Sequence, residues 1–191
     1  MANKRKQCKF CKEYTEVDTG VQVPIGYFCM HKHAIAFANM KQNKAKQKAA
    51  RVQHKADKER IKPRAKWLAE LQALVNKYVR LRDRAHGCIS CDKPASWSGQ
   101  WHASHLHSRA HSANLRFNLW NIHKSCSVCN SHLSGNIGQY TPRLIKKIGQ
   151  EKVDWMDANK SQPKSYEIEY IKRAIKIARK AIKREERKIM V

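Results

Sequence analysis

The chain has 191 residues, with 40 lysines and arginines against 15 aspartates and glutamates, which gives a net charge of +25. This charge favours a polyanionic partner, and nucleic acid is a stronger candidate than an anionic membrane surface. No stretch approaches the roughly 20 apolar residues of a membrane-spanning helix, and the N-terminus has no signal-peptide pattern, so we expect a cytoplasmic protein without a membrane partner.

Cysteines and histidines in residues 1–34 predict a small zinc knuckle. Disulfides are rare in the cytosol, so the seven cysteines are expected to be metal ligands. CKFC supplies two ligands and Cys29 a third. His31 or His33 could be the fourth, and we favour His33 because its longer spacer is less cramped. A segment this short needs the metal in order to fold, and the alternative is a disordered basic tail. The predicted ligands are Cys8, Cys11, Cys29 and His33.

Residues 35–62 are predicted to form a basic helical linker. The segment is rich in Ala, Lys and Gln and contains neither Gly nor Pro, so its helix propensity is high. Its apolar positions are mostly alanines, so we expect the helix to project into solvent. It is either a solvated linker or a helix that lies along DNA phosphates. The candidate phosphate contacts are Lys41, Lys44, Lys48, Arg51 and Lys55.

Residues 63–159 are predicted to form the main domain. Pro63 suits the first turn of a helix, and the apolar residues from Trp67 to Val79 recur at the spacing of one buried face. The arginines that follow this helix either reach DNA or face solvent. They are Arg80, Arg82 and Arg84.

Two CxxC pairs within this domain predict a second zinc site. Its ligands are Cys88, Cys91, Cys126 and Cys129. Residues 95–107 alternate loosely, which predicts short strands around a turn at Ser98 and Gly99. A short helix is expected to begin at the second CxxC pair and to end near Gly135.

Two helices are predicted after the second zinc pair. Thr141 and Pro142 are typical of an N-cap and a first turn, and Val153, Trp155 and Met156 are expected to close a small core. Residues 160–191 predict a basic helix with isoleucines at heptad spacing. That seam fits a short coiled-coil homodimer or packing within its own domain. The other face offers DNA contacts at Lys176, Arg179, Lys180 and Lys183.

Histidines and asparagines between the CxxC pairs exceed what a zinc site requires. Hydrolysis of a phosphodiester needs a general base, a cation and a scaffold that holds both. His105 can accept a proton, because the ordinary pKa of histidine is about 6.5. The Asn121 amide can fix a hairpin by hydrogen bonding, and the Asn130 oxygen can face a metal. Basic residues of the same stretch that could contact DNA are Arg109, Arg116 and Lys124.

The motifs CISC, WHASH and NIHKSCSVCN resemble the HNH nucleases, whose small core is of the zinc-stapled, treble-clef-like ββα-metal type. The order of a zinc knuckle, a basic helix and then LRFNLWNIHKSCSVCNSHLSGN resembles more closely the NinG family of lambdoid phages, also called Rap. The resemblance implies an α+β fold and a structure-specific endonuclease. Its substrates would be branched double-stranded DNA, such as D-loops and Holliday junctions, during phage homologous recombination in the host cytoplasm. Two structural Zn²⁺ ions and a catalytic Mg²⁺ or Mn²⁺ are also implied.

By motif position, the resemblance makes His105 the general base, Asn121 the residue that orients the hairpin, and Asn130 a ligand of the catalytic metal. His102 and His132 are further candidate ligands, although strand alternation turns positions 102 and 105 to opposite faces unless the backbone bends. Ser104 stands where many HNH nucleases have an acidic ligand, so Mg²⁺ would bind weakly. The alternative is a non-catalytic zinc-finger protein that binds nucleic acid.

Overall fold

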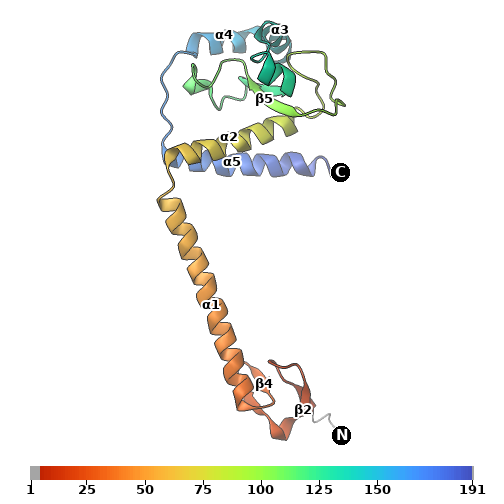
Figure 1. Ribbon diagram of the computed structural model, residues 1–191, viewed down its shortest axis with the longest axis vertical. Helices are drawn as coiled ribbons and strands as arrows, with labels where there is room; N and C mark the ends of the chain where they lie inside the picture. The colour runs from red at the N-terminus through yellow and green to blue at the C-terminus, as the bar shows by residue number, and fades with distance from the viewer. Residues whose placement is uncertain (1–4, 191) are drawn as a thin grey trace. The chain divides into compact units, whose positions relative to one another are not determined.

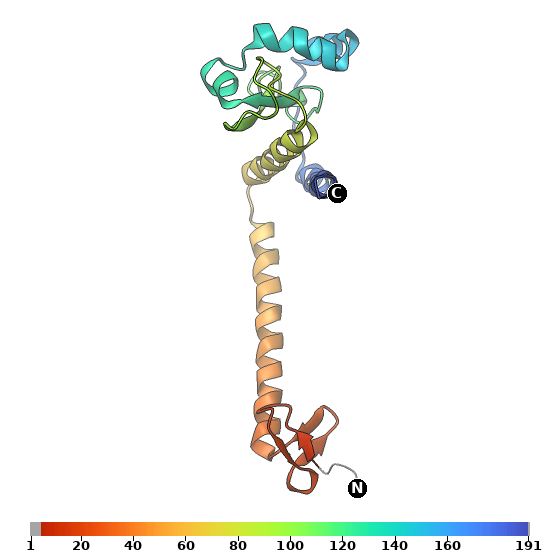
Figure 2. The ribbon, with the colours of Figure 1, turned by 90° about the vertical axis from the view of Figure 1, so that its right-hand side faces the viewer.

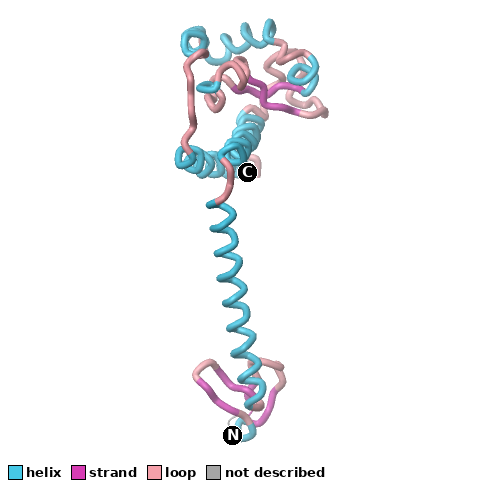
Figure 3. Tube along the Cα trace, turned by 60° about the vertical axis from the view of Figure 1, so that its left-hand side comes forward, coloured by secondary structure: helices cyan, strands magenta, loops and turns pink. Residues whose placement is uncertain are grey.

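The computed structural model describes residues 5–190, which form two compact units that divide between Lys62 and Pro63. The chain combines helices with three small antiparallel two-stranded sheets, so the predicted α+β class is confirmed (Figures 1 and 3). None of the helices within residues 5–190 is both long and apolar enough to cross a membrane.

The N-terminal unit consists of two hairpins followed by a long helix. Strands β1 (Arg5–Gln7) and β2 (Tyr14–Glu16) pair, as do β3 (Val21–Val23) and β4 (Gly26–Phe28), with the short helix η1 (Val17–Thr19) between the pairs. Phe28 is fully buried and contacts the ring of Phe37 at 5.3 Å between centroids. Its partner Phe37 belongs to helix α1 (His31–Arg60), so the second hairpin packs on the start of that helix.

Helix α1 confirms the predicted basic helix, but it begins before the predicted boundary at residue 35. None of its residues is buried, as the lack of a wide apolar stripe predicts. Its first turn already contains His33. Because that histidine must reach the cysteines of the knuckle, the knuckle and the helix share residues 31–34.

In the second unit, helix α2 (Arg64–Arg82) packs along helix α5 (Ile168–Arg187), and the two lie side by side in both ribbon views (Figures 1 and 2). Ile171 and Ile175 of α5 are buried in the same core as Leu71 and Val79 of α2. The isoleucine seam therefore packs within its own unit, and residues 160–190 are part of the same compact unit as the main domain. Glu185, which interrupts the seam, accepts hydrogen bonds from Arg84 at 3.2 Å and Lys188 at 2.7 Å.

A hairpin formed by β5 (Trp101–His105) and β6 (Ile122–Cys126) is the centre of the second unit, and its register pairs Trp101 with Cys126 and His105 with Ile122. The predicted turn at Ser98 and Gly99 between two strands is wrong, because residues 95–107 contribute only β5. Trp97 instead folds back onto Trp101, with ring centroids 5.1 Å apart, and packs on the cysteine cluster. Residues 106–121, including the short helix η2 (Ala113–Leu115), connect the strands.

After β6 comes a short π-helix, η3 (Val128–His132), and Gly135 follows with a positive φ of 89°, as predicted for the end of that helix. Helix α3 (Ile137–Ile148) begins earlier than the predicted N-cap at Thr141, so Pro142 lies inside it. Pro142 has no backbone N–H, so the helix lacks one hydrogen bond near its start. The earlier start of the helix, in turn, brings Tyr140 into it, and the Tyr140 side chain is completely buried. The Tyr140 hydroxyl donates to the carbonyl of Ser104 at 3.1 Å.

Helix α4 (Gln150–Asn159) closes a second core with α3. Val153 and Met156 are buried there as predicted, but Trp155 is 47 % exposed, so its predicted place in the core is wrong. A helix turns 100° per residue, and the face that carries positions 153 and 156 is not the face of position 155.

Candidate functional site

The N-terminal unit gathers three cysteines and one histidine. Cys8 and Cys11 lie in the turn between β1 and β2, Cys29 follows β4, and His33 lies in the first turn of α1. Their ligand atoms all lie within 4.8 Å of one another. The Nδ1 atom of His33 completes the set, so the geometry favours His33 over His31.

The second unit gathers four cysteines from the segment before β5 and from the end of β6 with the residues that follow it, which meet at one end of the hairpin. Cys88 and Cys91 precede β5, Cys126 ends β6, and Cys129 lies in η3, with their sulfurs within 4.8 Å of one another. The backbone N–H groups of Cys126 and Ser90 donate to the Cys88 sulfur at 3.2 and 3.4 Å. Such hydrogen bonds stabilise thiolate, the form that binds metal.

Both clusters could hold structural zinc. Ligands about 2.3 Å from a tetrahedral zinc ion are about 3.8 Å apart. The sulfurs of Cys91 and Cys126 are 3.8 Å apart, and those of Cys11 and Cys29 are 3.7 Å apart. All seven cysteines are free thiols, and all belong to these two clusters.

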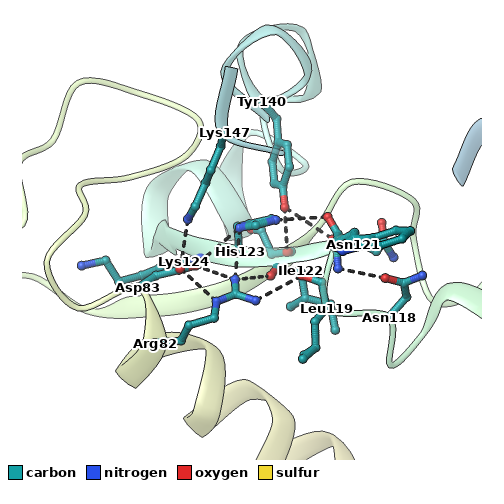
Figure 4. A network of polar contacts seen from close by, with 12 residues as sticks. Arg82, Asp83, Asn118, Leu119, Asn121, Ile122, His123, Lys124, Tyr140 and Lys147 are labelled. Carbon is teal, nitrogen blue, oxygen red and sulfur yellow. Dashed lines mark hydrogen bonds and ion pairs between the residues drawn. The ribbon is translucent and has the colours of Figure 1, made fainter. Parts of the chain in front are cut away.

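A buried charged network behind β6 ties the end of α2 to the hairpin (Figure 4). The carboxylate of Asp83, only 3 % exposed, accepts from Arg82 at 2.7 Å and from the Lys147 ammonium at 2.9 Å. The guanidinium of Arg82 also donates to the carbonyl of Ile122 at 2.9 Å. Burial alone would raise the pKa of Asp83, but the hydrogen bonds from Arg82 and Lys147 and the positive charge of Arg82 outweigh it and hold that pKa far below its usual range. Asp83 is therefore ionised.

His123 is neutral within this network. Its Nε2 lies 3.1 Å from the carbonyl of Trp120, which can only accept, so Nε2 carries the hydrogen. Its Nδ1 then accepts from the Arg82 guanidinium at 3.1 Å. Burial and the charges of Lys147 and Arg82 lower the pKa of His123 despite the nearby Asp83. Sequence reasoning did not predict this network. The available signal was a single acid flanked by Arg82 and Arg84.

A polar hollow lies beside β5 and contains four of the predicted site residues, namely His102, His105, Arg109 and Asn130. It is lined by Asn76, Arg80, His102, Ala103, His105, Ser108, Arg109, Asn130, Ser134 and Gly135. His102 and His105 both border it, so the expectation that strand alternation separates them is wrong for this site. Positions of both faces of β5 line the hollow, with His102 on one face and Ala103 and His105 on the other.

His105 is held in one tautomer. Its Nε2 lies 3.1 Å from the backbone carbonyl of Arg116 and must therefore donate. Nδ1 is left with its lone pair and has no hydrogen-bond partner among residues 5–190. Burial lowers the pKa of His105 to about 4, and the charges of Arg109 and Arg116 add to this effect, although the Arg116 carbonyl opposes it. The imidazole is neutral at physiological pH.

His102 and Asn130 lie side by side in the hollow. The side-chain amide N–H of Asn130 is 3.1 Å from the Nδ1 of His102 and can donate to it, so the two side chains are in direct contact. The hydroxyl of Ser104 donates to the Asn130 oxygen and is within hydrogen-bonding distance of the Ser125 hydroxyl. Ser104 is 1 % exposed, so it positions Asn130 and does not itself face the hollow.

Asn121 and His132 lie outside the hollow. Asn121 is fully buried, and its side chain accepts from the His107 N–H at 2.8 Å and donates to the carbonyls of His107 and Leu115 at 3.0 and 3.1 Å. It fixes the loop that connects β5 to β6, which is the orienting role that the sequence predicts. His132 is exposed and does not line the hollow, so the three candidate ligands of the catalytic metal are not brought together.

Most of the predicted DNA contacts are exposed basic side chains, namely Lys41, Lys44, Lys48, Arg51, Lys55, Arg109, Lys176, Arg179, Lys180 and Lys183. Of these, Arg179 pairs with Glu70 at 2.6 Å. Lys124 departs from the prediction, because it is 3 % exposed and donates to the carbonyl of Arg84 at 3.1 Å. Arg116 is partly buried and donates to the Gln72 side chain at 3.1 Å. Of Arg80, Arg82 and Arg84, only Arg80 lines the hollow.

Comparison with known proteins gives one consistent family. A family model described as "Bacteriophage Lambda NinG protein" matches residues 1–188. The chain is 37 % identical over 169 residues to "Protein ninG" of Escherichia phage 933W, covering 81 % of each chain. It is 48 % identical over 99 residues to "Protein ninG" of Escherichia phage lambda, covering 52 % of this chain and 48 % of that relative. No solved structure matches the chain.

Metal analysis tests the two cysteine clusters. We expect the purified chain to carry two zinc ions, and His33→Ala to carry one, because an incomplete ligand set binds zinc much more weakly. His31→Ala is the matched control and should retain both ions. Elemental analysis after dialysis measures the ratio of zinc to protein, and retention of two ions by His33→Ala would show that His33 is not a ligand.

Asp83→Asn tests the buried network. Removal of one partner from a buried ion pair costs about 3–5 kcal/mol because the remaining charge is left unpaired. The control is Asp92→Asn, since the ion pair of Asp92 with Arg143 is exposed and such pairs contribute about 1 kcal/mol or less. Urea unfolding at neutral pH measures both changes. Equal losses for the two variants would contradict the role given to Asp83.

Proposed function

The chain belongs to the NinG family of bacteriophage lambda, and from that premise we propose that it is a metal-dependent, structure-specific DNA endonuclease with an HNH-type ββα-metal core. Its substrates are branched recombination intermediates, Holliday junctions and D-loops. The observation that carries the proposal is the neutral His105, whose Nδ1 is free in a polar hollow that it shares with His102, Asn130, Arg80 and Arg109.

In this proposal His105 is the general base. Its Nδ1 takes a proton from water, the water oxygen bonds to phosphorus, and the bond between phosphorus and one ester oxygen breaks. A pKa of about 4 makes free His105 a weak base, because a protonated ring would be partly buried near Arg109 and Arg116. A bound phosphodiester places a negative charge there and thereby favours the imidazolium that forms.

His102 and Asn130 are the residues proposed to hold the catalytic Mg²⁺ or Mn²⁺. A divalent cation at this place would stabilise negative charge on the phosphate and on the leaving oxygen. Among the described residues that line the hollow there is no carboxylate, so the phosphate of the DNA must supply the hard anionic ligands. We therefore expect metal affinity to be weak without DNA, and Mn²⁺, which accepts nitrogen ligands more readily, to support activity at least as well as Mg²⁺.

The basic side chains support recognition of DNA shape. Arg80 and Arg109 border the hollow, where they can hold the phosphates beside the scissile bond. Exposed lysines on α1 and α5 add phosphate contacts, which position a duplex without reading its bases. A protein of this kind distinguishes branched from linear DNA by the arrangement of its phosphates.

Cleavage of labelled Holliday-junction, D-loop and linear duplex DNA tests the proposal. With Mg²⁺ or Mn²⁺ we expect the unaltered protein to cut the branched substrates. His105→Ala should cut about 10²- to 10⁴-fold more slowly, the usual contribution of a general base, and should bind as tightly. His111→Ala, which removes an exposed histidine of the neighbouring loop, is the control and should cut normally.

The alternative function gives a different outcome. If all variants bind branched DNA tightly and none cuts with either metal, while the zinc content shows both clusters filled, the chain is a non-catalytic zinc-finger protein that binds nucleic acid.

A further inference from the structure

Two tryptophans meet at a second hollow that the proposed chemistry does not use. Trp120 lies in the loop before β6 and is 40 % exposed, and Trp155 of α4 is 47 % exposed. Their ring centroids are 5.7 Å apart and their planes are almost perpendicular, at 89°. Asn118, Glu151 and Lys152 line the same hollow. Because neither indole is in the core, both keep large apolar faces in contact with water.

Both indoles are attached to rigid backbone. The N–H of Trp120 donates to the Asn118 side chain at 2.8 Å, and its carbonyl accepts from His123 at 3.1 Å. The next residue, Asn121, is fully buried. Trp155 lies on α4, which is anchored by the buried Val153 and Met156. The hollow is therefore preorganised, and a ligand would not have to order it on binding.

The geometry suits a flat aromatic ligand. Two perpendicular rings form a corner, in which a third ring can stack on the face of one indole and meet the edge of the other. The ammonium of Lys152 lies 5.7 Å from the centre of the Trp120 ring and donates to the carbonyl of Ile148 at 3.1 Å. It adds a positive charge beside the stacking surface, where an attached phosphate would lie.

Polar groups in the hollow fit the edge of a base better than a phosphate. The Nδ2 of Asn118 and the carboxylate of Glu151 have no hydrogen-bond partner among residues 5–190. A carboxylate repels a phosphate but accepts hydrogen bonds from ring N–H and amino groups. Guanine presents two such donors side by side on its Watson–Crick edge, whereas thymine presents only one.

We infer that this hollow binds an unpaired nucleobase of the DNA, with a preference for guanine over thymine. The inference rests on the proposed action on branched DNA, because bases inside a duplex are stacked and only an extruded base can reach such a pocket. Branch points supply unstacked bases. The hollow would thus add recognition of an open base to the recognition of shape by basic residues.

Binding to two duplexes tests the inference, one fully paired and one with a single extra guanine in one strand, without added Mg²⁺ or Mn²⁺. Trp120→Ala and Trp155→Ala should each weaken binding of the bulged DNA about tenfold, as loss of one stacking aromatic does, and should leave binding of the paired duplex nearly unchanged. Ile177→Ala, which removes an exposed apolar side chain from α5, is the control and should alter neither.

Glu151→Gln gives a second test that does not disturb the rings. It should reduce the preference for a bulged guanine over a bulged thymine while leaving the paired duplex unaffected. Equal losses on both duplexes, or no loss on the bulged one, would overturn the inference. So would self-association of the chain that either tryptophan variant abolishes, because the hollow would then be a protein contact. No cleavage is measured, so the base pocket and the nuclease proposal can fail separately.

Discussion

The convergence of four sulfurs at the base of the β5–β6 hairpin is the constraint on which the second unit depends. Cys126 ends β6 and Cys129 follows in η3, so the cluster fixes where the chain leaves the sheet. Asn130 is the next residue and is thereby placed beside His102 of β5. A two-stranded sheet is marginal by itself in water. Its stability here comes from this cluster and from packing against α2.

The Asp83 network fixes the same hairpin through the backbone of β6. Arg82 and Asp83 end α2, and together they hold the backbone of β6 and the ammonium of Lys147 from α3. Partly buried charges of this kind contribute little net free energy when paired, but they are costly to break. They therefore favour one placement of α2 and α3 against the strand. The neutral His123 in this network also holds the carbonyl of Trp120, so the network supports the tryptophan hollow as well.

The sequence predicted those parts that depend on local spacing. CxxC pairs and the three-residue spacer before His33 identified both clusters, and helical periodicity identified α2 and α5. Features that depend on tertiary contacts were not predicted from the sequence. Burial of Tyr140 extends α3 past Pro142, and Lys124 is drawn under Trp101, with its ammonium 4.1 Å from the ring centre. The shared hollow of His102 and His105 was not predicted, because the alternation of side chains along a strand assigns the two positions to opposite faces.

The account rests most directly on the state of His105, which nitrogen-15 NMR of the zinc-loaded chain can measure. We predict a neutral ring at pH 7 with the proton on Nε2 and an unprotonated Nδ1, and protonation only as the pH approaches about 4. A proton on Nδ1 at neutral pH would contradict the role of His105 as the base, because no lone pair would then face the hollow. An ordinary histidine titration near pH 6.5 would contradict the burial that lowers the pKa of the ring.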